Sequence, residues 1–416
     1  MKTQVASLKA RLIKVIGFAL MGIVLVAAAT NVEVNRDAPG RSGPGSFYDL
    51  KVLIPAGSKL TVSETQKSWL KVSFENEQVW ISENALAEKD EPSNNPFYGM
   101  STGGARASAS PATISAAIKG FWTRYTYVDK SMLAEVPIDG DSISPVKVEA
   151  FEKERADAVS REKLMNRYKL QKQYRKPRMP YIKEKQLGYT IASSVAEGTL
   201  LDNEKVLTYV YSVGWYIADA TERPDIRFIF LILDTDKINA VACPGGYILL
   251  TKGVLNLIEN EAELAALLAH EMSHVIAGHG TRELEDESNK IGMAASDAFA
   301  RLDNEKGATK MEQELGAIAT RATSISLSPK LDKYEFEADA MALRYMARSG
   351  YDLDGHFRLL AKLKKKHDTE VDIFDLNYRN HPDFDKRLRN SEKEMDNYKK
   401  YSGQTFSAAF TENMVF

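Results

Sequence analysis

Residues 264–276 read LAALLAHEMSHVI, and this stretch decides the fold of the central part of the chain. Leu264, Leu268 and Met272 repeat at intervals of four, and further apolar residues widen the stripe that they form. An α-helix that is apolar on nearly every side is a buried helix. We therefore expect a buried helix within residues 259–280.

Two histidines and a glutamate interrupt the apolar surface of this helix. His270 and His274 are four residues apart, so they share one face with Cβ atoms about 6 Å apart and can bind one ion. Burial of these side chains is costly unless they are paired or coordinate a metal. Glu271 stands beside them and can accept a proton from an activated water, which completes the H-E-x-x-H signature of zinc peptidases. The alternative is a hydrogen-bonded histidine pair in the core.

A second segment supplies carboxylates for the same ion. Residues 334–342 read YEFEADAMA, in which Glu335 and Asp339 are four apart on one helix face. We expect Glu335 to be the third zinc ligand and Asp339 to accept the outer N–H of an imidazole. Glu337 points about 200° away from Glu335, which predicts a solvated or outer position.

A third histidine of the cluster is not expected to bind the metal. His279 follows His270 by nine residues, and nine helical steps of about 100° place it on the opposite face. Ala277 and Gly280 also occupy the positions at which the extended three-histidine motif requires Gly and His.

Composition excludes several classes of protein. The chain has 416 residues, 44% of them hydrophobic, which excludes wholesale disorder and predicts two or three domains. Lys and Arg number 55 against 57 Asp and Glu, a net charge of −2, so we expect no nucleic-acid partner. Cys243 is the only cysteine, which excludes intrachain disulfides and cysteine-ligated zinc. Cys243 is expected to be a small buried hydrophobe, and the alternative is a thiolate that latches the site.

The N-terminal part predicts export and a small β-domain. Residues 1–30 combine a basic start with an apolar run, which indicates a cleaved secretory signal or, alternatively, an uncleaved signal anchor. We expect contact with a membrane only in the second case. Residues 46–88 predict a small β-barrel. Its expected strands span 48–54, 59–63, 69–74 and 78–81.

The remaining segments follow from composition. Residues 89–147 are predicted to be a linker or weakly ordered, and 148–185 a charged helical segment that is solvated or, alternatively, contacts an anionic surface. Residues 186–400 form the predicted metallopeptidase domain and 401–416 a C-terminal tail. The fold class is α+β: a small N-terminal barrel followed by a mostly helical zincin domain with a small sheet.

Two parts of the chain resemble known families. The stretch GSKLTV at 57–62, with the tryptophan strands after it, resembles the bacterial Src-homology-3-like domain, whose members bind cell-wall peptides or other protein segments. The order of NAVACPGGYI at 239–248, the H-E-x-x-H helix, Glu335-x-Glu337-Ala338-Asp339 and His381-Pro382-x-x-x-x-Arg387 resembles the CAAX-prenyl-protease-like zinc metallopeptidases, which are gluzincins. A soluble bacterial branch of that family works in the periplasm.

The second resemblance implies a set of roles. It implies one zinc ion per chain on His270, His274 and Glu335, with Glu271 as general base. It implies that His381 and Arg387 lie near the scissile carbonyl, where His381 either donates to the oxyanion or ligates zinc at rest. The residues implied to pair with the substrate backbone as an edge strand are Asn239, Ala240, Val241 and Ala242.

These observations predict a periplasmic zinc endopeptidase that cleaves unfolded or misassembled envelope proteins. Residues 46–88 would bind cell wall or an envelope protein. The alternative is a chaperone-like envelope assembly factor whose zinc site is held closed and whose barrel tethers it.

Overall fold

The computed structural model describes residues 30–86, 143–175, 184–185, 188–189, 191–192, 200–282, 332–370 and 383–416. The predicted signal segment up to residue 29, most of the predicted linker and His381 lie outside these described residues.

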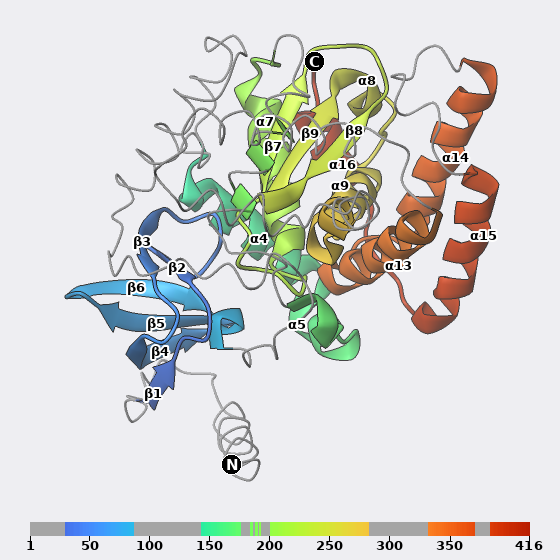
Figure 1. Cartoon of the computed structure of the whole chain (residues 1–416). Coiled ribbons are helices and arrows are strands. Elements are labelled where there is room, and N and C mark those ends of the chain that lie inside the picture. The colour runs from blue at the N-terminus through green and yellow to red at the C-terminus, as the bar shows by residue number, and fades with distance from the viewer. Residues whose placement is uncertain are drawn as a thin grey trace, which may run out of the picture.

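The N-terminal strands form one six-stranded antiparallel sheet with the order β1-β4-β5-β6-β2-β3 (Figure 1). The strands are β1 (Thr30–Glu33), β2 (Ala38–Arg41), β3 (Leu50–Ile54), β4 (Lys59–Gln66), β5 (Trp69–Phe74) and β6 (Glu77–Ser82). The four predicted strands are present. The first two strands precede residue 46 and extend the sheet beyond the predicted domain.

The prediction of a closed barrel was wrong. Among the described residues, β1 and β3 form the two edges of the sheet and do not pair with each other. Alternating apolar residues such as Val72 and Val79 do build a small core on one face. Alternation sets which side chains turn inward, but closure depends on strand tilt and register, which alternation does not encode.

The sheet packs directly against the helical part of the protein. The loop between β2 and β3 places Phe47 in the main hydrophobic core, where its ring stacks on Trp215 at 5.7 Å between centroids. Arg227 is buried and donates from Nη1 to the carbonyls of Phe47 at 3.1 Å and Tyr48 at 2.9 Å. Lys67 reaches across to Asp219, with 3.0 Å between Nζ and Oδ2.

Helix α9 (Glu261–Ala277) is the central element of the helical part, and every one of its residues is buried, as predicted. The side chain of Asn260 caps its first turn by accepting from the backbone N–H of Glu263 at 3.1 Å. Gly278 ends it in the left-handed region at φ 68°, a conformation that glycine adopts at little cost.

Other helices surround α9 (Figure 1). Helices α13 (Asp332–Ser349), α14 (Asp354–Thr369) and α7 (Glu204–Ala218) pack directly against α9. The described residues also form the helices α4 (Pro145–Val159), α5 (Arg161–Arg167), α15 (Phe384–Glu394) and α16 (Ser407–Asn413). Within the described part of the chain, no helix is both long and apolar enough to cross a membrane.

The small sheet predicted for this part is three-stranded, with the order β7-β9-β8. Strand β7 (Ile229–Leu233) runs parallel to β9 (Tyr247–Thr251), and β8 (Ala240–Cys243) runs antiparallel to β9. Among the residues that the structure describes, strand β8 is therefore an edge of the sheet, and it packs next to α9. Cys243 is fully buried in this strand, which agrees with the expected small hydrophobe.

The C-terminal residues pack onto the start of α9. The carbonyl of Thr405 accepts from the N–H of Ala262 at 3.2 Å, and Phe410 of α16 lies in the main core against Tyr209. These contacts satisfy a donor at the helix N-terminus that has no partner within the helix. The predicted tail therefore belongs to the packed structure.

Candidate metal centre

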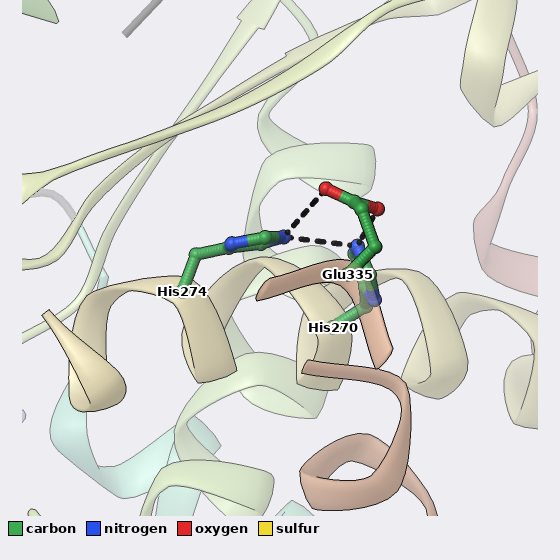
Figure 2. A group of neighbouring side chains, drawn as sticks. All are labelled: His270, His274 and Glu335. Atoms are coloured by element: carbon green, nitrogen blue, oxygen red, sulfur yellow. Dashed lines mark hydrogen bonds and ion pairs between the residues drawn. The ribbon is translucent and has the colours of Figure 1, made fainter. Parts of the chain in front are cut away.

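Three side chains from two helices converge on one buried point (Figure 2). His270 and His274 project from one face of α9, and Glu335 projects toward them from the first turn of α13. The two Nε2 atoms are 3.1 Å apart, and each lies 3.4 Å from an oxygen of Glu335. Within the described residues, these are the three side chains that could jointly hold an ion.

The donor set fits zinc. Bonds of about 2.0–2.2 Å at tetrahedral angles separate neighbouring ligand atoms by about 3.3 Å. The contacts of 3.1–3.4 Å agree with that separation. Glu335 is fully buried and both imidazoles are less than 8% exposed. A buried carboxylate next to two imidazole nitrogens is costly unless it is paired, so this environment favours a cation between the three groups.

His270 is held from behind by a buried ion pair. Its Nδ1 lies 2.9 Å from Asp339 Oδ1, within hydrogen-bond distance. Arg387 of α15 binds the same carboxylate through two contacts of 2.7 and 2.9 Å and reaches Glu335 Oε2 at 3.0 Å. The guanidinium therefore links the carboxylate behind His270 to the carboxylate predicted to bind metal.

The charges around Asp339 and His270 shift the pKa values of both residues. Burial acts to raise the pKa of Asp339, but Arg387 and His270 hold it well below its usual range. Burial and Arg387 act to lower the pKa of His270, yet Asp339 and Glu335 prevail and raise it to about 9. A proton on this ring is therefore favoured wherever a metal cation does not replace it.

His274 is held from behind by His279. The two Nδ1 atoms are 2.8 Å apart, and His279 Nε2 lies 3.0 Å from Glu337 Oε2. His279 is outside the group of three converging side chains, and it does not lie on the opposite face of the helix, where the sequence placed it. Gly278 ends α9, so the helical projection does not apply beyond it and the chain turns His279 back to His274. Gly278 is the signal in the sequence for this contact, because a glycine at that position predicts the end of the helix before His279.

The Glu337 carboxylate contacts several hydrogen-bond donors. Arg282 Nη1 lies 2.9 Å from Oε2, and the Tyr174 hydroxyl donates to Oε1. Burial acts to raise the pKa of Glu337, but His279, Tyr174 and Arg282 lower it to about 2. Burial lowers the pKa of His279. Glu337 is therefore an ionised acceptor in an outer position, as predicted.

Two further residues lie near the converging side chains: Glu271, which the sequence predicts, and His356, which it does not. Glu271 lies on α9 next to His270 and is 7% exposed. His356 of α14 was missed by the sequence reasoning, because no motif marks it. It lies 3.8 Å from Asp339 Oδ1 and 2.9 Å from Ser391 Oγ, and burial lowers its pKa to about 4.

The buried helix with two histidines, the carboxylate from a second helix and the edge strand beside them, as the described residues place them, form an arrangement typical of zincin-type metallopeptidases. Residues 206–395 match the family model of Peptidase family M48. The matched segment is thus similar to the M48 peptidases, and this similarity is coarser than the periplasmic branch predicted above. The family of the N-terminal sheet stays a prediction.

Curated relatives agree with this class. The chain is 29% identical over 186 residues to the "Beta-barrel assembly-enhancing protease" of Escherichia coli K12. The aligned residues cover 43% of this chain and 37% of that protein. The chain is 27% identical over 127 residues to the "Mitochondrial metalloendopeptidase OMA1" of Arabidopsis thaliana, covering 30% of this chain and 24% of the relative. The similarity thus spans well under half the length of these relatives.

Proposed function

We propose that this protein is a zinc-dependent endopeptidase with His270, His274 and Glu335 as the ligands of one zinc ion per chain. The observation that carries the proposal is the convergence of these three side chains, with spacings of 3.1–3.4 Å, inside a segment that matches a peptidase family. A bound zinc ion supplies Lewis acidity that polarises the peptide carbonyl and activates water.

Glu271 is proposed as the general base. It follows His270 directly, so its carboxylate belongs to the same helical turn as the ligand pair. A carboxylate there can accept the proton of the attacking water and deliver it to the leaving amine. His381 keeps its two proposed roles, as oxyanion donor or as resting ligand.

Arg387 receives a different role from the predicted contact with the scissile carbonyl. The residue is 2% exposed, and its guanidinium contacts Asp339 and Glu335 at 2.7–3.0 Å. We assign Arg387 and Asp339 to holding His270 and Glu335 in place. Metal-ligating histidines ordinarily have such a carboxylate behind them.

Strand β8 is proposed to bind the substrate backbone. The carbonyl of Asn239 accepts from Thr251 N–H at 3.2 Å, so Asn239 directs its backbone toward β9. In an antiparallel ladder this direction alternates, so Val241 also faces β9 while Ala240 and Ala242 face the open edge. An extended peptide would pair with Ala240 and Ala242, and Asn239 and Val241 would hold the strand in its sheet.

An edge strand recognises extended backbone more than a unique side-chain sequence. Unfolded or misassembled polypeptides are therefore the substrates that we propose, in the periplasm of an exporting cell. One relative carries the name "Beta-barrel assembly-enhancing protease", which is compatible with substrates of the cell envelope. Residues 46–88 are proposed to bind cell wall or an envelope protein.

The test combines metal analysis with cleavage of casein as an unfolded substrate. Wild-type protein should contain one zinc ion and cleave casein, and a chelator should abolish cleavage. Glu271→Gln should keep the zinc and lose about 10²–10⁴-fold in rate, since the amide keeps the shape but cannot accept the proton. A zinc-loaded wild type that leaves casein intact would favour the chaperone-like alternative.

A further inference from the structure

A continuous line of contacts runs from His274 to the surface. His274 Nδ1 faces His279 Nδ1 at 2.8 Å, and His279 Nε2 faces Glu337 Oε2 at 3.0 Å. Glu337 also accepts from Arg282 at 2.9 Å and from the Tyr174 hydroxyl. His270 is held differently, because a carboxylate contacts its ring directly.

The acceptor at the end of this line sets the position of each proton. An ionised carboxylate can only accept, so the His279 Nε2 that faces Glu337 must carry hydrogen. A neutral His279 then has its lone pair on Nδ1. The Nδ1 of His274 must therefore be the donor, which leaves the lone pair of His274 on Nε2, the atom that lies 3.1 Å from His270 Nε2 and 3.4 Å from Glu335 Oε1.

Packing holds the intermediate ring in this orientation. His279 is fully buried and stacks on Tyr334 with 4.5 Å between centroids and 21° between planes. Tyr334 directly precedes Glu335 in α13, and Glu337 follows two residues later. The first two turns of α13 thus carry one predicted ligand, Glu335, and both residues that contact His279, the imidazole next to the ligand His274.

We propose that His279 and Glu337 are positioning residues that select the tautomer and orientation of His274, so that metal affinity depends on them. This inference rests on the proposed function, because it takes His274 to be a zinc ligand. Outer partners of metal-binding histidines typically change metal affinity by about 10–100-fold when they are replaced.

The test measures the zinc dissociation constant of the full chain by chelator competition, together with the thermal midpoint of the metal-free protein. His279→Asn places a carbonyl oxygen near the former Nδ1 and can still accept from His274. His279→Phe keeps the stack on Tyr334 but offers no acceptor. Glu337→Gln replaces a carboxylate, which can only accept hydrogen bonds, with an amide, which can also donate one to His279.

We expect His279→Phe to weaken zinc binding by about 10–100-fold, Glu337→Gln to weaken it in the same direction, and His279→Asn to lie closer to wild type. Asp332→Asn is the matched control, because it removes an exposed carboxylate from the first turn of the same helix, α13, and should leave zinc affinity unchanged. The reverse order, with Phe closer to wild type than Asn, would show a packing role and overturn the inference. Equal affinity in all variants would overturn it as well.

The readout separates this inference from the proposed activity. Zinc binding that follows the expected order in a protein that does not cleave casein would support the positioning role and refute the peptidase. A wild type that binds no zinc would refute both.

Discussion

Replacement of Arg387 by methionine tests the assignment of this residue to the metal site. The side chain is 3% exposed, contacts Asp339 at 2.7 and 2.9 Å and contacts Glu335 at 3.0 Å. Methionine fills much of the volume but removes the guanidinium from two buried carboxylates, Asp339 and Glu335, which keep their contacts with His270. Loss of one partner of a buried ion pair costs about 3–5 kcal/mol. We therefore expect the free energy of unfolding of the metal-free protein to fall by about that amount.

Zinc should recover part of the loss, because a cation between the ligands faces the same Glu335. Urea unfolding of wild type and Arg387→Met, each with and without saturating zinc, measures both effects. Lys386→Met is the matched control, since its ion pair with Asp332 is 3.2 Å long and about half exposed on both sides. Such a surface pair contributes at most about 1 kcal/mol.

Two outcomes distinguish the roles of Arg387. A loss of about 3–5 kcal/mol, smaller with zinc, supports the positioning role. Stability equal to that of the Lys386→Met control, combined with a large loss of cleavage, would refute the reasoning. That outcome would instead support the role predicted from the sequence, in which Arg387 lies near the scissile carbonyl.

Three further predictions follow from the site and from the N-terminal sheet. Glu335→Ala should lose zinc, because two imidazoles leave the ion under-coordinated; equilibrium dialysis measures this, and retained stoichiometry would move the third ligand elsewhere. The raised pKa of about 9 at His270 means that protons compete with metal below that pH, so zinc affinity should fall by about tenfold per unit as the pH decreases from 8 to 6. Chelator competition across that range, with proton release recorded in two buffers, checks the sign, and a pH-independent affinity would contradict it. Deletion of residues 1–95 should destabilise the remaining chain by about 3–5 kcal/mol, because it removes Phe47 from the main core and the acceptors of buried Arg227. Unchanged thermal unfolding of the truncated protein would show an independent sheet.

Much of the proposed site is a consequence of local periodicity. Spacings of four along a helix place His270 beside His274 and Glu335 beside Asp339, whatever the rest of the chain does. The apolar residues around both segments predict that the helices are buried; α9 is buried along its whole length and α13 along most of it. The same kind of reasoning from alternation located the strands β3 to β6.

Tertiary structure decided what lies behind these side chains. The contact of His279 with His274 depends on the turn at Gly278 and on the packing of Tyr334, which join segments more than fifty residues apart. The burial of Arg387 against Asp339 and Glu335 likewise depends on how α15 docks on α13. Helical periodicity holds only within one helix, so it could not place either residue.

The N-terminal sheet shows the same division. Its alternating pattern predicts strands and an inward face, because successive side chains of a strand point to opposite sides. The insertion of Phe47 into the helical core depends on its contacts with Arg227 and Trp215, about 180 and 168 residues further along the chain. Whether the sheet closes depends on strand tilt and register, which alternation does not encode. Sequence by itself determined the elements and the residue types of the site. Their assembly was decided by long-range packing, since burial of shared apolar surface and of paired charges is a property of the folded chain as a whole.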